Sequence, residues 1–377
     1  MGSRSPSVRC LVLVASIVLL AVAGSAQVGA AASSAPAAGP TEAESYHVPD
    51  DCRDLLRVDE EMRRYFAGRV PRVSSAAAKV DAIVAAILER DGLAFFYLAE
   101  GNFDAREAFR RRQGNCMAFS LLLMAVVREF RLTAHFNEVC TGPQWSRVGR
   151  LVAEIHHLNV VVRTGTGSVV VDLLPLPGPG GGGVASQPVA DERAFAMFYC
   201  NNGVFLLGRG REREGLALLE RATTIAPGFA RCWVNLANAH SFLGDTERAQ
   251  ICFERALRVE PADLGALSGL AQLCRRTGQQ ERARRLEQRT EHYRERNPYY
   301  LAELARRDLA AGDTAMAMKR LRRALAIKDD EPEFYELAMA AARQLGRAKE
   351  AARWERRRAT LQAQLRPEEG GAAPITR

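Results

Sequence analysis

The second half of the chain repeats itself every 34 residues, and this period constrains the fold more than any other feature of the sequence. From residue 196 onward, large and small apolar residues return at fixed positions in five successive units. The clearest unit starts at Ala230 and is marked by Trp233, Leu236, Ala237, Ala249, Phe253, Ala256 and Pro261. Small residues let neighbouring helices approach and large ones fill the gaps between them, so the pattern predicts stacked helix pairs.

A helix pair of 34 residues is typical of the tetratricopeptide repeat, and we predict five such repeats over residues 196–365. Repeats of this kind stack into an all-α solenoid with a concave surface, which predicts a protein partner on the repeat surface. The last unit carries Glu355 and Arg358 where the other units are apolar, as expected for a repeat that ends the stack. The tail, 366–377, is rich in Pro, Glu and Gly and is predicted to be disordered.

A second constraint lies around Cys116, in the first half of the chain. Asn115 is of a residue type that caps helix starts, and apolar residues follow at helical spacing up to about Phe130. A buried helix is therefore expected to begin at Cys116. A thiol in the first turn faces unpaired N–H groups and the positive end of the helix dipole, which favours the thiolate. The alternative is that Cys116 is a small buried hydrophobe, as most free cysteines are.

Two predicted strands downstream supply the groups that a reactive thiol needs. Residues 154–162 predict a strand that carries His157, and residues 168–173 predict a neighbouring strand that carries Asp172. Cys116, His157 and Asp172 would then be the nucleophile, the base and the group that orients the base.

Other segments around this candidate site leave alternatives open. His156 competes with His157 for the base role, and because neighbouring strand residues point to opposite faces, only one of them can face the thiol. Residues 134–139 predict a further strand, and residues 140–149 predict a loop. Trp145 on that loop either lines a substrate cleft or covers the edge of the core.

The segment before the cysteine predicts helices that pack over the core. One runs from Asp59 to about Gly68, and Ser74-Ser75 is expected to cap the next. The apolar run 95–98 could add one wall of a substrate cleft. The run Arg110-Arg111-Arg112 either binds an anionic group of a substrate or is a solvated helix end.

The segments 105–116, 157–160 and 170–172, with Gly-Asn-Cys, His-x-Asn-Val and Val-Val-Asp, resemble the transglutaminase-like superfamily. In particular, the chain resembles bacterial members that carry tetratricopeptide repeats after the catalytic core. The resemblance covers roughly Thr41 to the end of the chain. It implies a papain-like α+β core in which the catalytic residues are Cys116, His157 and Asp172.

The sequence departs from the family pattern in two places. The family usually has Gly at the end of the Cys helix, where this chain has Arg131, and often an aromatic residue where this chain has Asn159. Neither change removes a catalytic group, but the second bears on the substrate-side wall of the site.

The resemblance implies a thiol-dependent acyl transfer on a peptide or protein substrate. Cys116 would attack an amide or ester carbonyl; a water acceptor gives hydrolysis and an amine acceptor gives a cross-link, and both remain open. We expect no cofactor and no metal, because no cysteine pair has C-x-x-C spacing and no calcium-loop pattern is visible. The alternative function is a non-catalytic tetratricopeptide-repeat scaffold or binding protein of the bacterial envelope.

The N-terminus has the pattern of a signal peptide. Arg4 and Arg9 form a basic region, residues 10–23 are apolar, and small residues at 24–26 offer a cleavage site. We therefore expect a periplasmic or secreted protein with no membrane span in the mature chain. The alternative is a membrane anchor formed by the uncleaved signal segment.

Export changes how the cysteines are interpreted. Removing Cys10 leaves Cys52, Cys116, Cys140, Cys200, Cys232, Cys252 and Cys274. This odd number fits one free reactive thiol with up to three disulfides in an oxidising compartment. For Cys252 and Cys274 the interpretation that we favour is a small apolar filler within a helix.

The net charge of +8 does not predict nucleic-acid binding. The arginines are scattered beside glutamates on predicted helix surfaces, as in residues 281–285, whereas a nucleic-acid interface gathers basic residues on one face.

The sequence therefore predicts an α+β transglutaminase-like (papain-like) core followed by an all-α tetratricopeptide-repeat solenoid. The predicted divisions are a signal peptide (1–26), a flexible leader (27–43), a transglutaminase-like domain with an N-terminal helical segment (44–176), a Gly/Pro-rich linker (177–195), the repeats (196–365) and the tail (366–377).

Overall fold

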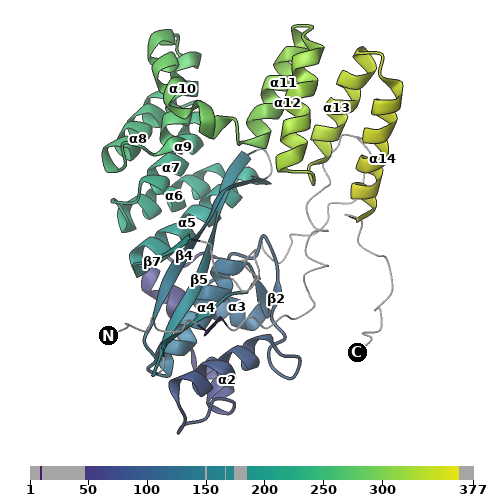
Figure 1. Cartoon of the computed structure of the whole chain (residues 1–377). Helices are drawn as coiled ribbons and strands as arrows, with labels where there is room; N and C mark the ends of the chain where they lie inside the picture. The colour runs from purple at the N-terminus through teal and green to yellow at the C-terminus, as the bar shows by residue number, and fades with distance from the viewer. Residues whose placement is uncertain (1–8, 11–46, 149–150, 166, 174–184, 365–377) are drawn as a thin grey trace, which may run out of the picture. The chain divides into compact units, whose positions relative to one another are not determined.

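The computed structural model describes residues 9–10, 47–148, 151–165, 167–173 and 185–364 (Figure 1). These residues fall into two compact units, which divide between Gly278 and Gln279, inside the predicted repeat region. The predicted leader and tail, and all of the predicted signal peptide except residues 9–10, lie outside the described residues.

The first unit begins with short helices, and the predicted caps at Ser75 and Asn115 are confirmed. They are the 3-10 helix η2 (Cys52–Leu56) and the α-helices α1 (Glu60–Ala67), α2 (Ala76–Leu88), α3 (Ala105–Arg111) and α4 (Cys116–Glu129). The side chains of Asp59, Ser75 and Asn115 each accept a hydrogen bond from a backbone N–H in the first turn of the helix that follows. The predicted helix that starts at Cys116 is confirmed, and residues 117–127 of it are all buried.

Four strands that follow α4 join β1 in a five-stranded sheet, in the order β1-β6-β5-β4-β7. Its strands are β1 (Arg9–Cys10), β4 (Ala134–Val148), β5 (Leu151–Thr164), β6 (Gly167–Val171) and β7 (Ala185–Val189). All neighbouring strands are antiparallel except β1 and β6, which are parallel. The predicted strands at 134–139, 154–162 and 168–173 are thus confirmed, apart from the last two residues of the third. A separate parallel pair joins β2 (Phe96–Tyr97) to β3 (Gln113–Gly114).

The predicted loop at residues 140–149 is wrong, because β4 continues to Val148 and forms a long hairpin with β5 (Figure 1). The pairing of the two strands shifts register between Val139 and Gln144. Pro143 falls inside this shift, and irregular positions of a strand tolerate a residue without an N–H donor.

The second half of the predicted linker, 177–195, is regular structure. Residues 185–189 form β7, which pairs with the outer edge of β4 from Phe136 to Cys140, and α5 starts at Asp191. The edge strand satisfies backbone groups of β4 that would otherwise be unpaired, and Pro188 is tolerated there because an edge strand has a free side. The Gly-rich residues 174–184 lie outside the described part of the chain.

The C-terminal half is a tetratricopeptide-like series of helices. In the first unit these are α5 (Asp191–Gly208) with α6 (Glu212–Ile225), α7 (Ala230–Phe242) with α8 (Thr246–Val259), and α9 (Leu264–Arg276). The second unit contains α10 (Gln280–Arg294), α11 (Pro298–Ala310) with α12 (Thr314–Ile327), and α13 (Pro332–Gln344) with α14 (Ala348–Gln364).

The turn inside each helix pair contains a glycine with a positive φ. These glycines are Gly210, Gly244, Gly278, Gly312 and Gly346, with φ between 69° and 85°, and each is 34 residues from the next. Glycine adopts this left-handed conformation without the steric cost that a side chain brings. The turn glycines therefore follow the same 34-residue period as the packed apolar residues.

Within the described part of the chain, these cysteines are free thiols: Cys52, Cys116, Cys200, Cys232, Cys252 and Cys274. Cys252 and Cys274 are buried in repeat helices, as predicted for apolar fillers. The sulfur atoms of Cys200 and Cys232 lie 3.4 Å apart. This contact and burial raise the pKa of the Cys232 thiol.

A buried carboxylate joins the sheet to the first repeat helices. Glu138 on β4 accepts hydrogen bonds from Arg193 of α5 and Arg231 of α7, each at 2.8 Å, and its side chain is 3% exposed. Both guanidinium groups also lie over the ring of Phe229, and Gln187 of β7 donates to the same carboxylate at 3.3 Å.

Among the residues that the structure describes, no helix combines the length and the apolar character that crossing a bilayer requires.

We predict that Glu138→Gln lowers the free energy of unfolding by about 3 kcal/mol, because two half-buried arginines would lose the charge that compensates their partial removal from water. Glu129→Gln is the matched control, since Glu129 forms an exposed ion pair with Arg63 and its loss should cost under about 1 kcal/mol. Urea denaturation of the full chain, followed by circular dichroism, measures both. Equal losses in the two variants would contradict the prediction.

Candidate active site at Cys116, His157 and Asp172

Cys116 is held at the start of α4 by the strand pair that precedes it. Gly114 of β3 pairs with Tyr97 of β2, and the Asn115 N–H donates to the Gly101 carbonyl at 2.9 Å. A side chain at position 114 would place its Cβ 2.6 Å from the Cβ of Ala118, so only glycine fits without a shift. In the Gly-Asn-Cys tripeptide, Gly114 allows close packing against Ala118, Asn115 caps the helix, and Cys116 is a half-buried thiol in the first turn.

The structure brings the three residues of the candidate site together. Nε2 of His157 lies 2.7 Å from both carboxylate oxygens of Asp172, and the Cys116 side chain is near enough to influence the pKa of the ring. Asp172 directly follows β6, the neighbour of β5, and β5 carries His157. Since Asp172 occupies Nε2, the Nδ1 atom is the ring nitrogen left for the thiol.

The protonation of His157 depends on opposing effects. Burial lowers its pKa, but hydrogen bonds to Asp172 and Cys116, together with the charges of both groups, raise the pKa to about 10. With this pKa the ring is protonated at neutral pH, and Asp172 stabilises the cation, so a proton taken from the Cys116 thiol would be held on His157.

Asn159, at the position where the family often has an aromatic residue, is a buried partner of Asp172. Asn159 is only 1% exposed, and its Nδ2 atom donates a hydrogen bond to the Oδ2 atom of Asp172 at 3.0 Å. Asn137 of β4 donates in turn to the Oδ1 atom of Asn159 at 2.9 Å.

Tyr97 is a residue of the site that the sequence did not single out. Burial raises its pKa to about 12, and the charge of the nearby Cys116 adds to the shift. Its hydroxyl group therefore stays protonated and can donate a hydrogen bond near the thiol. The sequence signal was present only as the apolar run 95–98, which predicts packing but no polar role.

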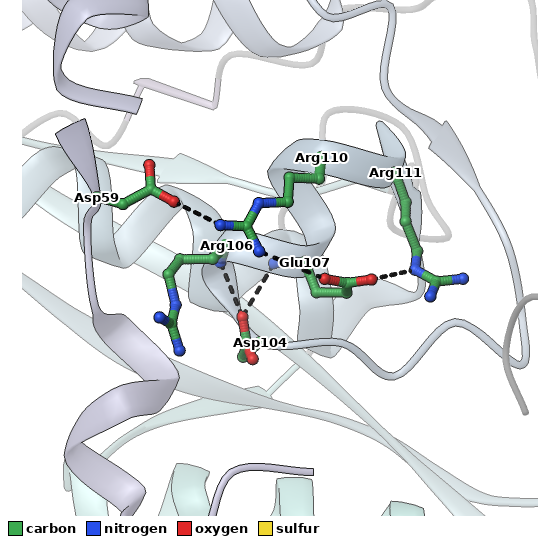
Figure 2. Close-up of polar contacts among 6 residues, drawn as sticks. All are labelled: Asp59, Asp104, Arg106, Glu107, Arg110 and Arg111. Carbon is green, nitrogen blue, oxygen red and sulfur yellow. Dashed lines mark hydrogen bonds and ion pairs between the residues drawn. The ribbon is translucent and has the colours of Figure 1, made fainter. Parts of the chain in front are cut away.

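The arginine run before the motif makes contacts within the protein (Figure 2). Arg110 pairs with Asp59 at 2.9 Å, and Arg111 pairs with Glu107 at 2.6 Å. Arg111 also lies over the ring of Phe103. Both charges are thus compensated by carboxylates, which favours a structural role over the binding of an anionic substrate group.

Two predicted site residues are not placed. The side chains of Trp145 and His156 lie outside the described part of the structure, so their roles stay predictions.

Comparison with protein families identifies a tetratricopeptide repeat at residues 230–263, which contain α7 and α8. No curated protein matches the chain. Three solved structures illustrate what the chain is similar to. The APC/C hetero-tetramer Cut9–Hcn1 is 17% identical with a TM-score of 0.35, over 45% of this chain and 34% of that chain. MamA (41–end) from Desulfovibrio magneticus RS-1 is 17% identical with a TM-score of 0.32, over 46% and 97%. BtubC (BKLC) from P. vanneervenii is 16% identical with a TM-score of 0.36, over 50% and 89%.

We predict that the stabilisation contributed by His157 decreases as the pH rises. Its folded-state pKa of about 10 exceeds the ordinary value of 6.5, so the contribution is complete below about pH 6.5 and is lost as the pH rises through 10. The free energy of unfolding of the wild type should exceed that of His157→Gln by a few kcal/mol at pH 6, and this difference should shrink towards pH 10. Urea denaturation at several pH values measures the difference. His135→Gln, in which another histidine is replaced, is the control. A difference independent of pH would be incompatible with this protonation.

Proposed function

We propose that the repeat helices bind a protein partner and that the chain acts as a scaffold. The observation that carries this proposal is the tetratricopeptide repeat at residues 230–263, within a series of helix pairs. Four large apolar side chains on the repeat helices are between 38% and 54% exposed: Ile251, Leu264, Met316 and Ile327. Exposed apolar residues of this size can contribute to a protein interface.

A second candidate function is favoured by the hydrogen bonds between His157 and Asp172 and by the nearby Cys116, which raises the pKa of the His157 ring. We propose that this site performs thiol-dependent acyl transfer on a peptide or protein substrate. The site would then act on a protein held by the repeats.

The proposed reaction proceeds in two steps. His157 accepts the Cys116 proton, the sulfur attacks an amide or ester carbonyl carbon, and the bond to the leaving amine or alcohol breaks as His157 returns the proton to it. An acceptor then attacks the thioester, gives its proton to His157, and releases the thiolate. The Cys116 N–H belongs to the first turn, whose N–H groups lack intrahelical partners, and so can donate to the oxyanion.

Two structural details support the transglutaminase-like assignment that we propose for the α+β region. Arg131, where the family usually has Gly, has a φ of 56°, which is the left-handed conformation that glycine favours. Gly114 lies where only glycine fits.

We further propose that the protein acts outside the cytoplasm, as a periplasmic or secreted protein. Water as acceptor gives hydrolysis, and an amine gives a cross-link.

Photo-crosslinking tests the scaffold proposal. A photo-reactive amino acid placed at Ile251 or Leu264 in the full chain, in the cells that make it, should yield the same discrete cross-linked protein. Val73 is the matched control, because it is 96% exposed and lies outside the repeats. Equal products from all three positions, or none, would count against a partner on the repeats.

Alkylation of Cys116 tests the acyl-transfer proposal. An ordinary thiol is only about 1% ionised at pH 6.5, whereas a thiol that gives its proton to His157 should react readily with iodoacetamide at that pH. We expect His157→Ala to slow Cys116 by about tenfold or more, and Asp172→Asn to slow it less. Mass spectrometry of the same digest reports Cys52, a half-buried free thiol, as an internal control. If Cys116 reacts no faster than Cys52 in wild type, the enzyme proposal fails.

A further inference from the structure

Three polar side chains form a row across neighbouring strands of the sheet. Asn137 of β4 lies directly opposite Asn159 of β5 in the strand register. Val160 pairs with Val171 of β6, so continuing the register by one residue places Asp172 opposite Asn159. Directly opposed residues point to the same face of a sheet, and His157 shares that face because it is two residues from Asn159.

The hydrogen bonds in this row fix the orientation of the Asn159 amide. Its Oδ1 atom accepts from Nδ2 of Asn137 at 2.9 Å, which leaves its Nδ2 to face Asp172, where it donates to Oδ2 at 3.0 Å. The reversed amide would place an oxygen against a carboxylate and two NH2 groups against each other. Asn137 therefore sets which end of Asn159 meets the carboxylate.

Burial makes this arrangement restrictive. Asn137 is 5% exposed and Asn159 is 1% exposed, so water cannot readily replace either partner. The carboxylate of Asp172 is 11% exposed and meets Nε2 of His157 on the side opposite to the thiol. A carboxylate held by a second donor has less freedom to rotate away from the ring.

We propose that Asn159, oriented by Asn137, is a positioning residue that fixes the Asp172 carboxylate against the His157 ring. This inference rests on the proposed acyl-transfer function for its chemical meaning, since a fixed carboxylate keeps the Nδ1 atom of His157 directed at Cys116. The row itself can be tested whether or not the site transfers acyl groups.

The test uses the full chain with ¹⁵N-labelled histidine, in which His157 is assigned by its loss in His157→Gln. In Asn159→Leu we expect the pKa of His157 to fall by about one unit or more, a tenfold loss of proton affinity, and the downfield Nε2–H signal to weaken. Asn137→Ala should shift both in the same direction by less. Alkylation of Cys116 at pH 6.5 should slow about tenfold in Asn159→Leu, while Cys52 is unaffected.

Asn202→Leu is the matched control, because Asn202 is also a buried amide and donates to the carbonyls of Asn102 and Phe198 rather than to Asp172. It should leave the titration of His157 unchanged. If Asn159→Leu folds and the pKa of His157 is unchanged or higher, the carboxylate keeps its place without the amide and the inference is wrong. If that variant does not fold, Asn137→Ala decides by the same criterion.

The outcomes separate the two proposals. An unreactive wild-type Cys116 with a His157 titration that depends on Asn159 removes the acyl-transfer function and keeps the positioning role. If Cys116 is reactive and neither its alkylation rate nor the pKa of His157 changes in Asn159→Leu, the acyl-transfer proposal is kept and the positioning role is removed.

Discussion

The arrangement of the first unit depends on one buried carboxylate. Glu138 accepts charged hydrogen bonds from Arg193 and Arg231, and so the sheet, α5 and α7 meet at a single side chain. A carboxylate removed from water without compensation would be too costly to keep its charge. The two arginines must therefore reach it in the folded state, and this requirement links strand β4 to the helices that begin the repeats.

The residue before Glu138 serves the candidate site. Neighbouring residues of a strand point to opposite faces, so Asn137 faces the row with Asn159 while Glu138 faces the arginines of the helices. A one-residue shift in the pairing of β4 would exchange these two side chains and disrupt both clusters. The register of a single strand thus sets the support of Asp172 and the attachment of the first repeat helices together.

Local signals in the sequence predicted the helix at Cys116 and the repeat pairs, because a cap, a period and an apolar face are all read within one element. They also placed His157 on one strand and Asp172 at the end of its neighbour, although Asp172 follows β6 rather than lying within it. Contacts between distant segments could not be read in this way. The contact of Asn159 with Asp172 was not foreseen, because nothing local shows that Asn137 lies opposite Asn159. The extension of β4 through Pro143 was missed for a similar reason: the register shift that tolerates proline exists only in the paired hairpin.

An apolar cluster in place of Glu138 and its arginines could stabilise the fold as well, because buried ion pairs gain little over well-packed hydrophobic residues. The difference lies in geometry. Apolar surfaces can slide against each other at small cost, whereas two hydrogen bonds of 2.8 Å to one carboxylate allow little displacement of α5 or α7. Since Asn137 is bonded directly to Glu138, the rigidity of that junction extends to the polar row. The attachment of the repeats and the orientation of His157 are therefore constrained through the same short stretch of β4.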